Sequence, residues 1–185
     1  MIKGIDVVST GDFTHPAWIK ELEEKLDPAG NGFYTLKQPP STEVFPYIKP
    51  QRRTVYFCLS VEVSCEYVIS NRKYRTHQLI YANNFETAYR INKIIAKYGN
   101  LAADGRPSLR LQSHELFKII LNVPGAYFVP AHVWTPWCSS IGAMEGHDSL
   151  QDCFKDVTHE LFAVETSLSG DPQMCRRYDA LDNVT

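Results

Sequence analysis

The stretch TVYFCLSVEV, from Thr54 to Val63, is almost continuously apolar or β-branched. Such a run is expected for a strand that is buried on both faces, since a sheet covered by helices has no face exposed to water. The run carries one carboxylate, Glu62, close to its end. A buried strand holds its end residues rigidly, so this carboxylate is a candidate member of a site at the edge of a sheet.

Four further apolar runs carry a side chain that commonly binds metals, at or beside one end. These runs are VVSTGDFTH at 7–15 with Asp12 and His15, HQLIYA at 77–82 with His77, FVPAH at 128–132 with His132, and FAVE at 162–165 with Glu165. Imidazole and carboxylate ligands together suit zinc, manganese or iron, and carboxylates that bridge several ions favour hydrolysis of phosphate esters. A lone histidine or glutamate is more often structural, but the collective pattern favours a metal-dependent hydrolase.

Helices and strands are expected to alternate along the chain. A helix should follow Pro16, where Trp18, Leu22 and Leu26 recur every four residues, and end at Asp27-Pro28. Residues 29–50 are rich in Gly and Pro and predict a long excursion without a regular central strand or helix. The remaining expected elements are a hairpin turning near Asn71, helices beginning at Asn84 and Ser113, a strand at 127–133, a short helix at about 149–154, a strand at 160–165, and a last helix at about 171–181.

This alternation predicts one α/β domain with a mainly parallel sheet, open or closed. The candidate ligands near the strand ends favour a barrel, where side chains at the C-terminal ends of parallel strands converge. His77 begins its run instead of ending it, so an antiparallel or hairpin strand must bring it to the others. With 185 residues and 44% apolar content, we expect a single core.

Composition bears on the kinds of partner and on the compartment that can be expected. A net charge of −2 gives no electrostatic argument for nucleic-acid binding. No stretch approaches the roughly 20 apolar residues that span a bilayer, so no membrane association is expected. Five widely spaced cysteines, without a C-x-x-C pair, predict reduced thiols in a cytoplasmic protein.

An aromatic segment directly follows His132. Trp134 and Trp137 are candidates to stack on a nucleic-acid base, although packing of the loop is the more frequent role of at least one such residue. Arg106 lies in a turn and is a candidate to hold a phosphate through its forked donors, whereas most loop arginines only meet solvent. The sequence does not identify a general acid, and His114, His147 and His159 are expected to be ordinary surface residues.

Six segments together resemble the polymerase-and-histidinol-phosphatase (PHP) domain, and more narrowly the endonuclease Q family. They are STGDFTHPAWIKELEEKLDP at 9–28, LSVEVS at 59–64, RTHQLIYA at 75–82, YGNLAADGRPSL at 98–109, VPAHVWTPW at 129–137 and FAVETSLSGDPQM at 162–174. The resemblance runs over nearly the whole chain. GDFTHP, DGRP and PAHVWTPW carry it in that order.

The resemblance implies a distorted (β/α)7 barrel, similar to a TIM barrel, with up to three metal ions at its C-terminal face. The ions are usually zinc, with manganese or magnesium as alternatives. It also implies cleavage of DNA on the 5′ side of deaminated bases, such as uracil and hypoxanthine, or of abasic sites. By motif, the implied metal ligands are Asp12, Glu62, His77 and His132, with His15 and Glu165 nearby.

Members of this superfamily open with a His-x-His strand and close with an Asp-x-His strand, and this chain shows neither. We therefore expect residues 1–185 to form a single partial PHP domain, incomplete at both termini, with impaired activity. Two alternatives stay open. One is a PHP phosphatase that acts on a small phosphate monoester, and the other is a non-catalytic remnant that binds DNA or a partner.

Overall fold

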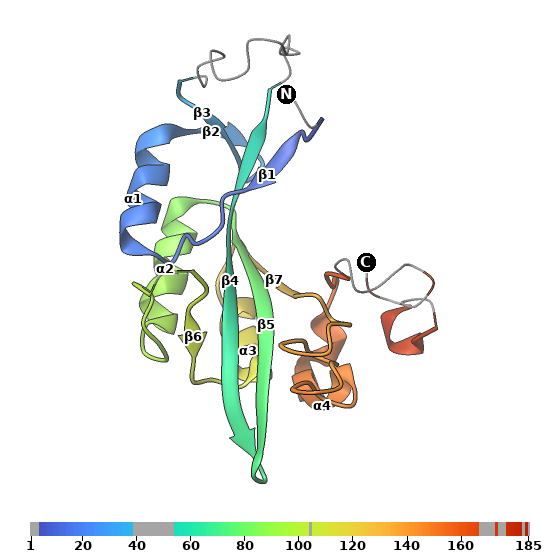
Figure 1. Cartoon of the computed structure of the whole chain (residues 1–185). Coiled ribbons are helices and arrows are strands. Elements are labelled where there is room, and N and C mark those ends of the chain that lie inside the picture. The colour runs from blue at the N-terminus through green and yellow to red at the C-terminus, as the bar shows by residue number, and fades with distance from the viewer. Residues whose placement is uncertain are drawn as a thin grey trace, which may run out of the picture.

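The computed structural model describes residues 4–38, 54–103, 105–166, 173, 177–182 and 184. Its strands form one seven-stranded sheet in the order β2-β3-β4-β5-β7, with β1 and β6 also paired to β4 (Figure 1). The strands are β1 Val7–Ser9, β2 Leu26–Gly30, β3 Phe33–Leu36, β4 Tyr56–Ile69, β5 Arg72–Ala82, β6 Ser108–Leu109 and β7 Ala126–Pro130. The prediction that helices and strands combine in an α/β fold is confirmed.

The central feature of this sheet is a long hairpin of β4 and β5. The two strands pair from Leu59 opposite Ala82 to Ile69 opposite Arg72. Ser70 and Asn71 turn the chain with φ angles of 48° and 62°, as the tight turns that suit the twist of a hairpin require. The predicted turn near Asn71 is thus confirmed. The apolar run at 54–63 enters β4 at Tyr56, but the expectation that the whole run is buried on both faces is wrong, because Thr54 and Tyr56 are exposed and the buried residues begin only at Leu59.

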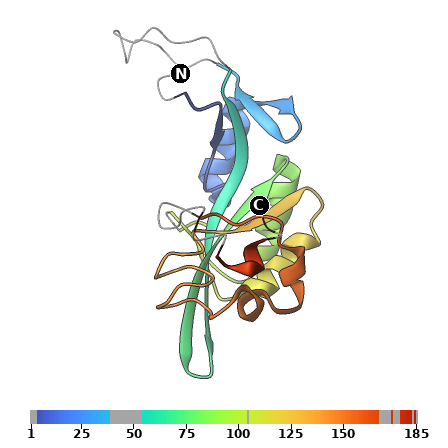
Figure 2. The same cartoon turned by 90° about the vertical axis from the view of Figure 1, so that its right-hand side faces the viewer.

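Three helices pack against one face of the sheet: α1 Pro16–Lys25, α2 Phe85–Ile95 and α3 Ser113–Leu121. The predicted helix starts are confirmed at α2, where the Asn84 side chain accepts from Thr87 N–H, and closely at α3, where Gln112 and Glu115 form a capping box. Figure 2 shows α2 and α3 on one side of the β4–β5 hairpin and much of the segment that follows β7 on the other.

The prediction of a mainly parallel sheet is wrong. Only β1 and β6 run parallel to β4, whereas the β2–β3, β3–β4, β4–β5 and β5–β7 pairs are antiparallel. A strand buried on both faces gives the same apolar run in either orientation, so the run could not distinguish them. Within the described residues the sheet is also not closed, so a (β/α)7 barrel is not confirmed.

The predicted excursion at 29–50 is partly wrong, because a second hairpin begins before it and continues into it. β2 and β3 pair antiparallel around Asn31 and Gly32, where both φ angles are positive. Pro28 lies within β2, which an edge strand tolerates since one row of its backbone groups needs no partner. The remainder of the excursion, at 39–53, lies outside the described residues.

The strand predicted at 160–165 is also wrong. A 3-10 helix, η2, spans Lys155–Glu160, and an extended segment without strand assignment follows it. Glu165 nevertheless bonds to the chain around β7, donating its N–H to the Pro130 carbonyl and accepting from Val133 N–H. The short helix predicted after Ser149 is confirmed as α4, Leu150–Phe154. Part of the helix predicted at 171–181, namely residues 171, 172 and 174–176, lies outside the described residues. The described part has no helix at 177 and 178 and a 3-10 turn, η3, at Asp179–Leu181, so one continuous helix to Leu181 is not confirmed.

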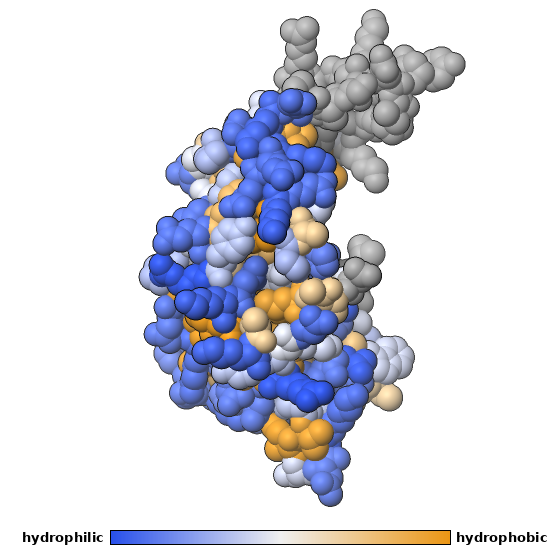
Figure 3. Space-filling view, turned by 90° about the vertical axis from the view of Figure 1, so that its left-hand side faces the viewer, coloured by the Kyte–Doolittle hydropathy of each residue, from blue (hydrophilic) through white to orange (hydrophobic). Residues whose placement is uncertain are grey.

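Most of the surface seen from the helix side is hydrophilic, with a separate hydrophobic patch near the tip of the β4–β5 hairpin (Figure 3). Val68, at this tip, is 65% exposed. No helix among the described residues is long and apolar enough to cross a membrane. The four cysteines within the described part of the chain are free thiols, as predicted, and Cys175 lies outside it.

Candidate metal centre

Three of the predicted ligands meet on the face of the sheet opposite the helices. Glu62, His77 and His132 each offer a ligand atom, and these atoms all lie within 4.8 Å of one another. In the β4–β5 register, Ser64 is opposite His77 and Leu79 is opposite Glu62. Glu62 and His77 are therefore diagonal neighbours on one face, since side chains alternate along a strand. The hairpin thus brings His77 to the site, as its place at the start of its run required.

His132 reaches the same face from the end of β7. β7 pairs with β5 as far as Pro130, and Ala131 N–H then donates to the His77 carbonyl. The next residue, His132, has a φ angle of +31°, a backbone conformation that costs free energy for a residue with a side chain. Its imidazole Nε2 lies 3.0 Å from His77 Nδ1.

The carboxylate oxygen Oε1 of Glu62 forms a triangle with these two imidazole nitrogens. It is 3.2 Å from His77 Nδ1 and 3.8 Å from His132 Nε2. This oxygen is buried and has no hydrogen-bond partner. A buried carboxylate oxygen without a hydrogen bond, facing two imidazole nitrogens, fits a divalent cation bound by one oxygen and two nitrogens.

Glu165 holds His132 in this orientation. Its Oε2 accepts from the His132 backbone N–H at 2.6 Å and lies 3.3 Å from His132 Nδ1. A proton on Nδ1, facing this carboxylate, leaves the lone pair of Nε2 directed toward Glu62 and His77. Histidine ligands of metals are commonly oriented by a carboxylate in this way. Glu165 is therefore placed as a positioning residue.

Arg106 contacts the cluster from the turn before β6. Its Nη2 donates to Glu62 Oε2 at 3.0 Å, its Nε lies 3.0 Å from Oε1, and its Nη1 lies 3.3 Å from His77 Nε2. Burial alone would raise the pKa of Glu62, but the interactions with His77 and Arg106 lower it to about 2. Burial lowers the pKa of His77, and the nearby Arg106 and His132 act in the same direction. Glu62 is thus ionised and His77 neutral at pH 7, the forms that bind metals.

Three of the candidate ligands, Asp12, His15 and Glu165, are not part of the close cluster that the described residues form. His15 caps α1, with its Nδ1 accepting from Trp18 N–H at 3.4 Å, which gives it a structural role. Asp12 has a φ angle of +44°, and the next residue, Phe13, donates its N–H to the Ser60 carbonyl. The turn that contains Asp12 therefore lies against β4 at Ser60, which is two residues before Glu62.

The two tryptophans have different environments. Trp134 is half-buried, and its ring centroid lies 5.7 Å from that of Tyr178, which is packing within the chain. Trp137 is 56% exposed. Only the Trp137 indole therefore presents a large surface to a ligand.

His147, predicted to be an ordinary surface residue, is instead buried. Its Nε2 lies 2.7 Å from the Tyr67 hydroxyl, and its ring stacks on Tyr74 with centroids 4.2 Å apart. Beyond the end of β7, the segment before His147 lies along the edge of β5. There the Cys138 carbonyl accepts from His77 N–H. No local pattern could reveal this role, because His147 lies in an irregular loop and its partners come from the hairpin.

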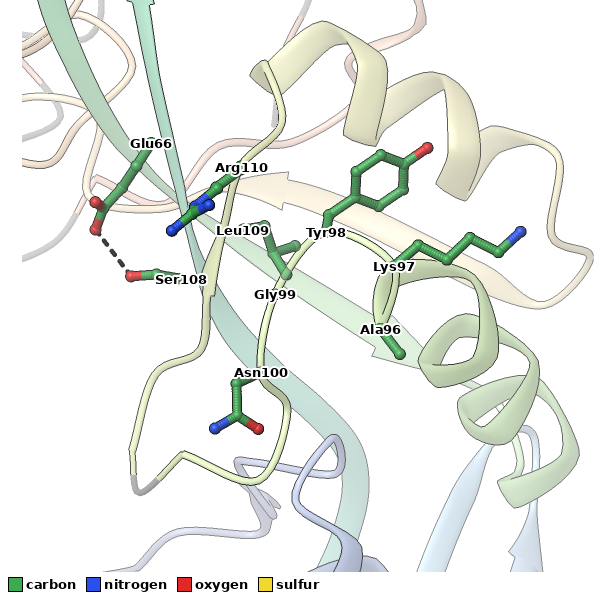
Figure 4. A pocket seen from close by; sticks show the side chains of 9 residues that line it. All are labelled: Glu66, Ala96, Lys97, Tyr98, Gly99, Asn100, Ser108, Leu109 and Arg110. Atoms are coloured by element: carbon green, nitrogen blue, oxygen red, sulfur yellow. Dashed lines mark hydrogen bonds between the residues drawn. The ribbon is translucent and has the colours of Figure 1, made fainter.

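A cavity of about 600 Å³ lies further along β4 and contains none of the three ligands. Figure 4 shows Arg110 on the side of Glu66 and Ser108, which bond to each other, whereas Lys97 points away from that pair. The lining mixes one carboxylate, Glu66, with the basic side chains of Lys97 and Arg110 and with polar and apolar groups, and it is not part of the metal-type cluster found among the described residues. The chemistry of the site therefore belongs to the Glu62, His77 and His132 cluster.

The fold and the cluster define a mixed α/β domain with a candidate metal centre on the open face of its sheet. No protein-family model matches the chain. An uncharacterised protein of Methanocaldococcus jannaschii is 24% identical over 136 residues, which is 73% of this chain and 13% of that protein.

Two solved structures are similar over nearly the whole chain. One is the lesion-specific endonuclease PfuEndoQ from Pyrococcus furiosus, with a TM-score of 0.74, 24% identity, and coverage of 98% of this chain and 38% of that one. The other is endonuclease Q in complex with a 27-mer duplex that has an abasic lesion at the active site, with the same TM-score and identity and coverage of 99% and 39%. The chain thus has an endonuclease Q-like fold and spans well under half the length of these proteins.

Proposed function

We propose that this chain is the metal-binding part of a phosphodiesterase of the endonuclease Q type, which acts in DNA repair. The observation that carries the proposal is the convergence of Glu62, His77 and His132, with His132 oriented by Glu165. The fold supports it, since a protein of similar fold binds duplex DNA with an abasic lesion at its active site. Cleavage on the 5′ side of deaminated bases or abasic sites is the reaction we propose.

The ligand set suits zinc, with manganese or magnesium as alternatives. A bound ion would activate water and stabilise the charge that develops on the phosphorus oxygens. Glu62, His77 and His132 would hold the first ion. Asp12, whose turn lies against β4, is the candidate for a further ion of the family's set of up to three.

The other residues of the site would bind the nucleic acid. Arg106 carries a forked donor beside the ligands, where it can pair with a phosphodiester. The exposed indole of Trp137 follows the metal cluster in the chain and offers a face on which a base can stack. We propose that the protein acts in the cytoplasm, where its thiols stay reduced.

Metal titration of the purified chain tests the centre. We expect stoichiometric binding of zinc by calorimetry, and loss of binding in Glu62→Ala and His132→Ala. Glu66→Ala is the matched control, because Glu66 lies on the same face of β4 but outside the cluster. If both cluster variants still bind zinc, the proposal of a metal centre in this cluster is refuted.

Two substrates then separate the possible reactions. Nicking of a duplex with a single uracil, hypoxanthine or abasic site supports the nuclease, whereas hydrolysis of a small phosphate monoester alone would indicate a phosphatase. Binding of such a duplex without hydrolysis, with all metal ligands intact, would indicate a non-catalytic DNA-binding protein.

A further inference from the structure

Arg106 is held beside the candidate metal centre by the backbone that follows it. The next residue, Pro107, accepts from Ser64 N–H through its carbonyl, and β6 then pairs with β4 at Ser64 and Cys65. This fixes the start of the Arg106 side chain next to the strand that carries Glu62. The side chain itself is 39% exposed, so it is free to move without disturbing the core.

The guanidinium faces the Glu62 carboxylate, one of the three groups that a metal would use, and it also contacts the His77 ring nitrogen that is turned away from His132. Nitrogens of Arg106 lie 3.0 Å from each of the two carboxylate oxygens of Glu62. A third nitrogen lies 3.3 Å from His77 Nε2. Arg106 is thus an ion-pair partner of Glu62 with one formed hydrogen bond, from Nη2 to Oε2.

We infer that Arg106 is a built-in counter-ion of the cluster, which competes with a metal ion for Glu62 and is displaced when the ion binds. The inference rests on the proposed metal centre. A divalent cation bonded to Glu62 would lie beside the Arg106 guanidinium, and the two positive charges would repel each other. The guanidinium must therefore leave the carboxylate before the ion can bind with full affinity.

A displaced guanidinium is then available to an anion. Because Arg106 is tethered beside the centre, a phosphodiester near the ion would find both the ion and the released guanidinium. Binding of metal and of phosphodiester should thus be positively coupled, and by linkage each should tighten the other. Arg106 would therefore make the site bind a metal more tightly when an anion is present than when it is absent.

The test measures metal affinity and not turnover. Manganese is titrated into chelator-treated protein by calorimetry, with and without dimethyl phosphate as the simplest phosphodiester. In Arg106→Ala we expect manganese alone to bind about fivefold more tightly, since the competing ion pair is gone and a partly exposed pair is worth about 1 kcal/mol, a factor of about five in affinity. Dimethyl phosphate should tighten manganese binding in the unmodified chain and leave Arg106→Ala unaffected.

Arg110→Ala is the matched control, because it removes the same charge near the same strand but no contact with the cluster. It should change manganese affinity by less than about threefold, since exposed charges at a distance are screened. Thermal denaturation of each variant confirms that it folds. Manganese binding that Arg106→Ala leaves unchanged or weakens would overturn the inference alone. If neither the unmodified chain nor either variant binds manganese, the proposed metal centre and the inference are both overturned.

Discussion

His147 ties the loop that flanks the metal centre to the β4–β5 hairpin, and it should make the protein sensitive to acid. Burial is the main reason that the pKa of His147 falls from 6.5 to about 4, and its contact with the Tyr67 hydroxyl leaves it little access to water. A histidine with a lowered pKa is neutral when folded but gains a proton when unfolded at mildly acid pH. Its contribution to stability is therefore complete above pH 6.5 and is lost as the pH falls toward 4.

The size of this effect follows from the shift. The two pKa values differ by about 2.5 units, which limits the loss to about 3 kcal/mol at pH well below 4. At pH 5 the folded form is still neutral while the unfolded form is protonated, and the loss relative to pH 7.5 is about 2 kcal/mol. This is a large part of the 5 to 15 kcal/mol by which folded domains are usually stable.

Urea denaturation at pH 7.5 and pH 5 measures the loss. Because other groups titrate over the same range, the comparison is with His147→Phe, which keeps an aromatic ring against Tyr74 but carries no proton. The variant should be less stable than the unmodified chain at pH 7.5, since it lacks the bond to Tyr67, but its stability should fall by about 2 kcal/mol less on acidification. An equal fall in both proteins would refute the reasoning.

Three further predictions concern the site and the fold. Glu165→Gln should lower zinc affinity by about 10- to 100-fold, because His132 loses the carboxylate that orients it, and calorimetry would show unchanged affinity if Glu165 has no such role. Trp137→Ala should weaken binding to an abasic duplex by about 1 to 3 kcal/mol in fluorescence anisotropy, whereas equal binding would exclude stacking on this indole. Leu59→Ala should reduce the free energy of unfolding by about 2 to 5 kcal/mol, measured with urea, since Leu59 is fully buried; a loss below 1 kcal/mol would contradict its place in the core.

Local features of the chain were predictable because they depend on neighbours in the sequence. Asn71 marked the hairpin turn, and Asn84 marked the start of α2 through its bond to Thr87 N–H. The expectation that the ligands lie at strand ends holds for His132, just past β7, but it is wrong for Glu62 and His77, which lie within β4 and β5. The resemblance to the endonuclease Q family agrees with the fold of the solved structures.

Strand direction, by contrast, was decided only by tertiary structure. A run buried on both faces is the same in parallel and antiparallel sheets, and the sequence alone favoured the wrong one. The antiparallel register sets Glu62 and His77 on the same face as diagonal neighbours. Long-range pairing thus made the cluster that the apolar runs only suggested.

The sequence determined which side chains were available to bind a metal, because their chemical type and their place in each run are local properties. Tertiary structure determined what each one does. It places Glu165 behind His132, Arg106 against Glu62, and His147 in a buried stack. These roles depend on contacts between residues from 33 to more than 70 positions apart, and such contacts are fixed by the packing of the whole sheet, which no local pattern records.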